Sequence, residues 1–340
     1  MKRIAWICVV WLVVVSLVLP GADTPADEEA YTAARRQVGT LYQQKKYAEA
    51  ARLLEEMLVR YPAHRHANAY NLALMYGFLG NLDRGVEVLR AALDAGVWFG
   101  KYDFAPEPWA PYQDYMPFQE FERQNETARQ SVQMDAKPEL VVKTPRDFER
   151  NKTYPLFIAL HGGGENLKQF MPRWTSPLLE SEYIVAYLQS SQMISMDGFN
   201  WTEDIEISKR EIAEAFKKVQ TEYPVDEHAV LIGGFSSGGV AALEVAMTGT
   251  VPVAGFVVLC PARPEGLDVS RIAAARQRGV RGTLLTTEMD GRIAQQREMA
   301  ALFREAGLQY QFVVTPDIGH WYPENLPDLI DRGIFHITHR

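Results

Sequence analysis

The stretch AVLIGGFSSGGVAALEVAM, residues 229–247, decides the fold. It opens with an apolar run typical of a buried strand and closes with a run of helix-forming residues. Between them stands GFSSGG, residues 234–239, so Ser236 lies at a turn with glycine on both sides. Glycine suits this turn because a Cβ on either side would collide with neighbouring backbone. A strand that passes through G-x-S-x-G directly into a helix presents its serine as a nucleophile.

Short apolar segments alternate with helical segments on both sides of this stretch. We expect strands at 140–143, 156–160, 184–188, 229–233, 255–259, 283–287 and 311–314, and helices at 205–222, 238–247, 292–306 and 324–332. This alternation predicts an α/β domain over residues 137–340, with a mostly parallel sheet covered by helices on both faces. Catalytic residues of such a sheet lie at the carboxyl ends of its strands.

A serine hydroxyl needs a base to become a nucleophile, and the base needs an acid that orients it. His320, in PDIGHWYP, follows the last expected strand and is our candidate base. Asp290, in LLTTEMDGRI, follows the penultimate strand and is our candidate acid. Glu288 and Asp317 are rivals for the role of the acid. The order serine, acid, histidine is the one that this type of sheet uses.

A glycine-rich loop, HGGG at residues 161–164, follows the expected strand 156–160. Glycine lets a backbone N–H approach the negative oxygen of a tetrahedral intermediate without hindrance from a side chain. We expect the N–H of Gly163, or else that of Gly162, to form an oxyanion hole together with the backbone N–H of Ser237.

Three further residues are candidates for substrate binding. Asn200 and Trp201 lie in MDGFNWTED after the third central strand, and Trp321 lies beside His320. Aromatic side chains at these positions could hold an apolar acyl or aryl group. They would serve equally well as core residues, and the sequence does not separate the two interpretations.

Taken together, strand-HGGG, GFSSGG, an aspartate at a strand end and a late Gly-His resemble the α/β-hydrolase superfamily over residues 137–340. The LHGGGEN and GFSSGG segments are most similar to carboxylesterase, phospholipase-like and polyhydroxybutyrate-depolymerase-like esterases. The resemblance implies a serine hydrolase that cleaves carboxylic esters through an acyl-enzyme on Ser236. It also implies that neither a metal ion nor an organic cofactor takes part.

The N-terminal part of the chain has a different, helical pattern. Residues 27–97 keep apolar side chains at three- and four-residue spacing and repeat with a period of about 35 residues, which resembles the tetratricopeptide repeat. We expect a small all-α domain there, with a protein partner as its potential ligand. Residues 98–136 are rich in aromatic residues and proline, and we expect a linker or capping segment.

Residues 1–22 place Lys2 and Arg3 before an apolar run, as a signal peptide does. The run is also nearly long enough to remain as an uncleaved membrane anchor. We therefore expect export to the periplasm or beyond, with membrane contact if the segment is not cleaved. Cleavage would remove Cys8 and leave Cys260 as the single cysteine.

The formal net charge of −8, without a basic run in the body of the chain, argues against a nucleic-acid partner. A small-molecule ester is the expected substrate. Two other functions stay open. One is a prolyl-oligopeptidase-like serine peptidase, and the other is a binding protein whose repeats recruit a partner while the hydrolase fold is idle.

Overall fold

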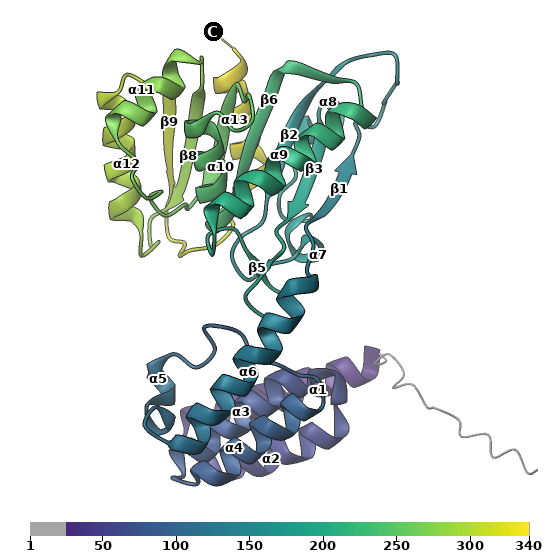
Figure 1. Cartoon of the computed structure of the whole chain (residues 1–340), viewed down its shortest axis with the longest axis vertical. Helices are drawn as coiled ribbons and strands as arrows, with labels where there is room; N and C mark the ends of the chain where they lie inside the picture. Colours follow the sequence, from purple (N-terminus) through teal and green to yellow (C-terminus); the bar gives the residue numbers. More distant parts are fainter. Residues whose placement is uncertain (1–24, 340) are drawn as a thin grey trace, which may run out of the picture. The chain divides into compact units, whose positions relative to one another are not determined.

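The computed structural model describes residues 25–339, which form two compact units (Figure 1). The first unit contains the described residues up to Val97 together with Pro106–Phe121, and the second contains Trp98–Ala105 and the residues from Glu122 onward. The expected signal or anchor at 1–22 lies outside the described residues. Within residues 25–339, no helix has both the length and the hydropathy needed to cross a bilayer.

The first unit is helical, as its apolar spacing predicts. Its main helices are α1 (Pro25–Gln43), α2 (Tyr47–Arg60), α3 (Arg65–Phe78) and α4 (Leu82–Asp94), with a short η1 (Pro62–His64) between α2 and α3. Leu54, Leu72 and Leu89, from three of these helices, are at most 2% exposed. Because each helix packs against the next along the chain, these apolar faces form one core.

Residues 98–136 are more regular than the linker or capping segment expected from their proline content. They contain α5 (Pro106–Trp109), η2 (Ala110–Tyr112) and the 20-residue helix α6 (Met116–Asp135). Within the first unit, the Tyr112 hydroxyl donates a 2.6 Å hydrogen bond to the carbonyl of Ala73, and the indole of Trp109 donates to the hydroxyl of Tyr70 at 2.8 Å. These buried aromatic residues therefore belong to the helical core.

The second unit is built on a seven-stranded sheet with the order β1-β3-β2-β6-β7-β8-β9. Its strands are β1 (Glu139–Lys143), β2 (Tyr154–Leu160), β3 (Ile184–Gln189), β6 (Val225–Phe235), β7 (Gly255–Leu259), β8 (Arg281–Thr287) and β9 (Tyr310–Thr315). The edge strand β1 runs antiparallel to β3, and all other neighbouring pairs are parallel. The predicted fold class, a mostly parallel α/β sheet preceded by helices, is confirmed.

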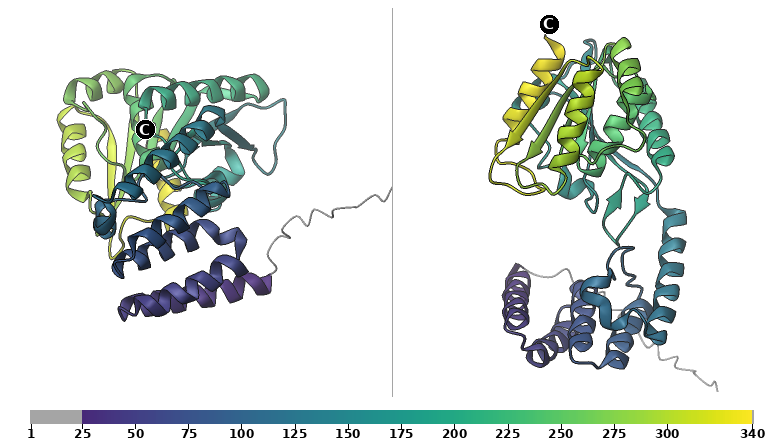
Figure 2. Two further views of the ribbon diagram at one scale, coloured as in Figure 1. Left: turned by 60° about the horizontal axis from the view of Figure 1, so that its bottom comes forward. Right: turned by 90° about the vertical axis from the view of Figure 1, so that its left-hand side faces the viewer.

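Helices cover both faces of this sheet (Figure 2). They are α7 (Leu167–Phe170), α8 (Pro177–Glu182), α9 (Ile205–Glu222), α10 (Ser237–Thr248), α11 (Val269–Gln277), α12 (Ile293–Glu305) and α13 (Leu326–Thr338); β4 (Gln192–Met193) and β5 (Phe199–Asn200) form a separate ribbon. Strand β2 shows why two layers are needed. Leu156 and Ile158 join the core under α9 to α12, while Phe157 and Ala159 join the core under α8 and α13. A strand buried on both faces is apolar throughout, as β2 is.

The turn from β6 into α10 is as tight as its glycines predict. A Cβ on Gly238 would lie 2.4 Å from the carbonyl oxygens of both Leu160 and His161. A Cβ on Gly234 would lie 2.5 Å from the Leu160 oxygen. Glycine at these positions lets the start of α10 approach the end of β2, which brings the loop after β2 close to Ser236.

Candidate active site

Ser236 occupies the turn between β6 and α10 with φ 51° and ψ −114°. A positive φ is unfavourable for a residue with a Cβ, so the surrounding structure must hold the serine in place. Part of that restraint is the Ser236 N–H, which donates to the Leu259 carbonyl at the end of β7 at 2.9 Å. The serine therefore stands at the carboxyl ends of the central strands.

His320 lies beside this serine, with Nε2 2.9 Å from Ser236 Oγ. The other ring nitrogen, Nδ1, lies 2.8 Å from Oδ2 of Asp290. The loop that carries the histidine is attached to the end of β8, because the Thr287 hydroxyl donates to the Gly319 carbonyl at 2.7 Å. The structure thus brings together three side chains that follow three different strands.

Asp290 is 3% exposed and accepts further hydrogen bonds from the Arg292 backbone N–H at 2.8 Å and from the Gln296 side chain at 3.1 Å. Burial works against its charged form, but these hydrogen bonds and the one with His320 outweigh burial and lower the pKa of Asp290. The rival acids lie elsewhere. The Asp317 N–H donates to Glu288 at 3.3 Å, and neither carboxylate is hydrogen-bonded to His320.

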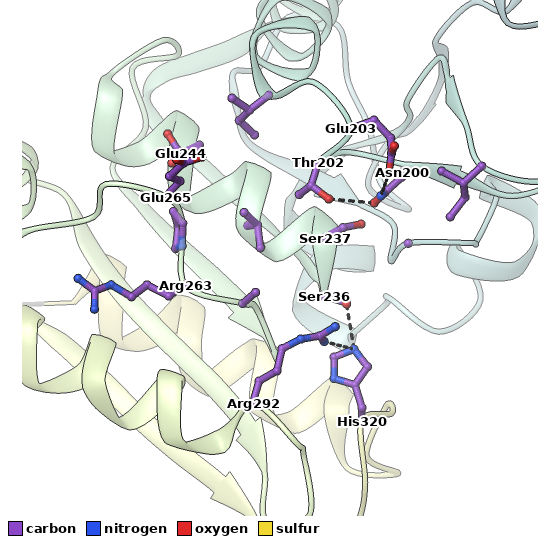
Figure 3. A pocket seen from close by; sticks show the side chains of 16 residues that line it. Asn200, Thr202, Glu203, Ser236, Ser237, Glu244, Arg263, Glu265, Arg292 and His320 are labelled. Carbon is purple, nitrogen blue, oxygen red and sulfur yellow. Dashed lines mark hydrogen bonds between the residues drawn. The ribbon is translucent and has the colours of Figure 1, made fainter. Parts of the chain in front are cut away.

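Arg292 is a fourth polar residue beside His320, and it was not among the residues expected from the sequence. Its Nη1 lies 3.3 Å from Nε2 of His320 (Figure 3). A guanidinium can only donate hydrogen bonds, so Nε2 is the acceptor and the ring proton lies on Nδ1, facing Asp290. This is the tautomer in which His320 can take a proton from Ser236.

The glycine loop after β2 divides into two parts with different roles. The N–H of Gly162 donates to Oε2 of Glu165 at 2.8 Å, so the expectation that Gly162 completes an oxyanion hole does not fit this structure. Gly163 instead lines the same cavity as Ser236 and Ser237. The two residues are close to each other, because a Cβ on Gly163 would lie 3.4 Å from the Ser237 Oγ.

Glu165 holds this loop in place through three partners. Besides the Gly162 N–H, it accepts from Arg173 Nη1 at 2.6 Å and from the Tyr322 hydroxyl at 2.5 Å. Burial of the phenol, reinforced by the Glu165 carboxylate, raises the pKa of Tyr322, which therefore stays a donor. The sequence showed Glu165 next to the glycines, but Tyr322 lies 157 residues further on, so the connection between the two loops gave no local signal.

A cavity of about 720 Å³ opens beside Ser236. Asn200 lines it, and its side-chain amide donates to Glu203 at 2.8 Å (Figure 3). Trp201 does not reach it, because this indole is fully buried in the core under α9. Trp321 is 51% exposed and lies beneath the Arg173 guanidinium rather than in the cavity lining. Of the three expected substrate-binding residues, Asn200 alone lines the cavity.

The cavity lining mixes apolar and polar groups. Ile194, Ile205 and Val240 supply apolar surface, while Thr202 and Arg263 supply polar groups. Glu203, Glu244, Glu265 and Arg292 add charged groups. Such a lining can bind a small molecule with both apolar and polar parts.

Cys260, Asp290 and His320 place potential metal-ligand atoms within 4.8 Å of one another. The Cys260 thiol lies 3.4 Å from the Thr287 hydroxyl. Asp290 and His320 are bonded to each other. These hydrogen bonds explain why the three side chains lie close together.

The second unit has the α/β-hydrolase fold, with the serine turn between β6 and α10. Residues 147–277 match the family described as phospholipase/carboxylesterase, a span that includes Ser236 and ends before Asp290 and His320. No curated protein matches the chain.

Solved structures are also similar to this chain. An uncharacterized protein from Bacillus cereus is 22% identical with a TM-score of 0.51, over 91% of this chain and 98% of that one. A ferulic acid esterase is 17% identical, with a TM-score of 0.46 over 59% of this chain and 98% of that one. A feruloyl esterase module from Clostridium thermocellum, complexed with sinapinate, is 18% identical, with a TM-score of 0.46 over 58% and 83%. At these identities the likeness concerns the fold.

Proposed function

We propose that this protein is a serine hydrolase that cleaves carboxylic esters, with Ser236 as nucleophile, His320 as base and Asp290 as the acid that orients it. The observation that carries the proposal is the continuous hydrogen-bonded chain from Ser236 Oγ through His320 to Asp290, at 2.9 and 2.8 Å. The serine end of this chain lines a cavity that is large enough for a small ester. The phospholipase/carboxylesterase match supports an ester as the substrate.

In the proposed reaction, Ser236 Oγ attacks the acyl carbon while its proton passes to His320 Nε2. The backbone N–H groups of Gly163 and Ser237 stabilise the oxyanion that forms. The intermediate then expels the alcohol, which takes the proton from His320, and leaves an acyl group on Ser236. Water then attacks the acyl carbon while one of its protons passes to the same nitrogen. His320 returns this proton to Ser236 Oγ as the second intermediate collapses, which releases the carboxylic acid and restores the free serine.

Hydrolysis of nitrophenyl esters of graded acyl length tests this proposal, with Ser236→Ala beside the unmodified chain. We expect turnover to fall by about 10⁴-fold or more in the variant. Ser237→Ala is the matched control, because the Ser237 hydroxyl has no hydrogen-bond partner among the described residues and the variant keeps the backbone N–H. A fluorophosphonate should label the control but not Ser236→Ala. Full turnover by Ser236→Ala would exclude the assignment.

The peptidase alternative predicts that a peptide amide is cleaved, whereas an esterase should leave it nearly untouched. The idle-fold alternative predicts no reaction with the fluorophosphonate. The hydrogen-bonded serine, histidine and aspartate argue against an idle fold, and the phospholipase/carboxylesterase match favours an ester over a peptide.

We further propose that the helical unit is a pair of tetratricopeptide-like repeats that binds a protein partner, and that residues 1–22 direct export. The starts of α2 at Tyr47 and of α4 at Leu82 keep the 35-residue spacing of the sequence pattern. Retention of the unmodified chain in the cytoplasm of its host would contradict the export proposal.

A further inference from the structure

Arg292 is a cation in the cavity lining that lacks an acidic partner. Its guanidinium contacts His320 Nε2 at 3.3 Å and forms no ion pair with any residue between 25 and 339. Two of the three carboxylates that line the cavity are paired with other cations. Glu203 pairs with Lys101 at 2.6 Å, and Glu244 pairs with Arg271 at 2.7 Å. Arg292 is therefore free to bind an anion supplied from outside the protein.

The position of Arg292 indicates which half of an ester would carry that anion. His320 Nε2 delivers its proton to the departing alcohol, so the alcohol half of the substrate must lie next to this nitrogen. The carbonyl oxygen of the acyl half belongs in the proposed oxyanion hole, at the backbone N–H groups of Gly163 and Ser237. A guanidinium within hydrogen-bond distance of Nε2 thus faces the alcohol half.

The charge of Arg292 affects the reaction, because it repels the positive charge that forms on His320. When His320 accepts the proton of Ser236 it becomes an imidazolium, and a guanidinium a few ångströms away opposes that charge. A neutral ester leaves this repulsion in place. An ester with an anionic group binds the guanidinium, neutralises it and removes the repulsion at the moment when the imidazolium forms.

We propose that the site hydrolyses esters whose alcohol half carries an anionic group, a carboxylate or a phosphate, which Arg292 binds. The inference rests on the proposed esterase function and names the substrate class for the same site. The acidic residues of the lining do not oppose it. Glu244 and Glu265 lie at the part of the cavity away from His320 (Figure 3), and Glu244 is already paired.

The test compares acetyl esters of phenols that differ in the group at the meta position: meta-acetoxybenzoate, its neutral amide meta-acetoxybenzamide, and meta-acetoxyphenyl phosphate. We expect kcat/KM for the unmodified enzyme to be about tenfold or more higher for an anionic ester than for the amide, a preference that falls at high salt. The carboxylate and phosphate arms show which anion the site prefers.

Arg292→Gln should change the two kinds of ester in opposite directions. Its kcat/KM should fall about tenfold for the anionic esters, because binding is lost, and rise for the amide, because the repulsion is removed. Arg263→Gln is the matched control. That arginine lines the same cavity, but its guanidinium donates to the Leu267 carbonyl at 2.7 Å and lies near Glu298. We expect it to leave the anion preference unchanged.

Equal rates for the anionic and neutral esters, or an Arg292→Gln enzyme with the same preference as the unmodified chain, would overturn the inference while leaving the esterase intact. Failure of the esterase proposal is a separate result, in which no ester is hydrolysed and Ser236 is not labelled. A neutral fluorophosphonate should label Arg292→Gln, which shows that the variant is folded.

Discussion

The hydroxyl of Tyr322 donates a 2.5 Å hydrogen bond to Oε2 of Glu165, and the same oxygen accepts the backbone N–H of Gly162 at 2.8 Å. Tyr322 stands two residues after His320, and Glu165 two residues after Gly163. The loop that carries the proposed base and the loop that carries a proposed oxyanion donor are therefore attached to one buried carboxylate. We infer that this carboxylate positions both loops relative to Ser236.

Tyr322→Phe should remove the bond between the His320 loop and Glu165 while keeping the aromatic ring in place. The phenylalanine ring keeps the packing against Phe235, whose ring centroid lies 4.3 Å away, but the bond to Glu165 is lost. We expect kcat for a neutral nitrophenyl ester to fall about tenfold with little change in KM, and the free energy of unfolding to fall by about 2 kcal/mol. Tyr187→Phe is the control, since it also loses a buried hydroxyl bond, to the Trp174 carbonyl, but away from both loops. Equal loss of kcat in both variants would contradict a positioning role.

Asp290→Asn should lower kcat by about 10⁴-fold, because an amide N–H facing His320 Nδ1 favours the tautomer with the proton on Nε2, which cannot accept from Ser236. Glu288→Gln and Asp317→Asn serve as controls, since neither side chain is bonded to His320. Steady-state hydrolysis of a nitrophenyl ester measures all three. A loss of similar size in Glu288→Gln would reassign the acid.

Several elements could be predicted from the sequence because their signal is local. All seven expected strands occur within a few residues of their predicted bounds, since buried parallel strands are continuous apolar runs. Helix α11 was not expected, because VSRIAAARQ has a weak apolar period. Helix α13 continues to Thr338, beyond the predicted end at 332. Its later turns bury Ile334 and Ile337 against the sheet, which only the tertiary structure shows.

The site was less predictable than the sheet, because part of its geometry depends on contacts that have no local signal in the sequence. Ser236, Asp290 and His320 follow strand ends, so the order of the chain brings them to one edge. The direction in which Trp201 points depends on packing against distant segments. The bond from the Gly162 N–H to Glu165 is local, but Glu165 is also bonded to Tyr322, which is distant in sequence. Arg292 follows Asp290 by two residues, a spacing that could have indicated its place near the base.

His161 should make the stability of the protein depend on pH. Burial lowers the pKa of His161 to about 4 in the folded chain, against about 6.5 when unfolded. The unfolded chain therefore binds more protons between these values, so the stabilisation is complete above pH 6.5 and is lost as the pH falls toward 4. We expect this one residue to cost roughly 3 kcal/mol over that window.

Urea unfolding at pH 7 and pH 4.5 measures this effect, with His161→Asn as the comparison. Asparagine can donate to the Gly162 carbonyl as Nδ1 does, at 2.7 Å, but does not titrate. The variant should lose less free energy of unfolding between the two pH values than the unmodified chain. An equal loss in both would assign the acid sensitivity to other groups.

Cys260 should resist alkylation, because burial raises the pKa of its thiol to about 12 and the residue has no exposed surface. The experiment uses Cys8→Ser, which leaves Cys260 as the one thiol of the chain. We expect iodoacetamide at pH 8 to leave the native protein unmodified and to react fully after unfolding in urea. Rapid reaction of the native protein would show that this strand end opens to solvent.

The positive φ of Ser236 is unfavourable for stability, but the proposed activity requires the serine at this turn. At φ 51°, glycine would have the lower conformational energy, since it has no Cβ to clash with the neighbouring backbone. Serine thus stands here against the conformational preference of its own position. Glycine would relieve the backbone but would remove the hydroxyl, so the strain is the conformational cost of presenting Oγ to His320.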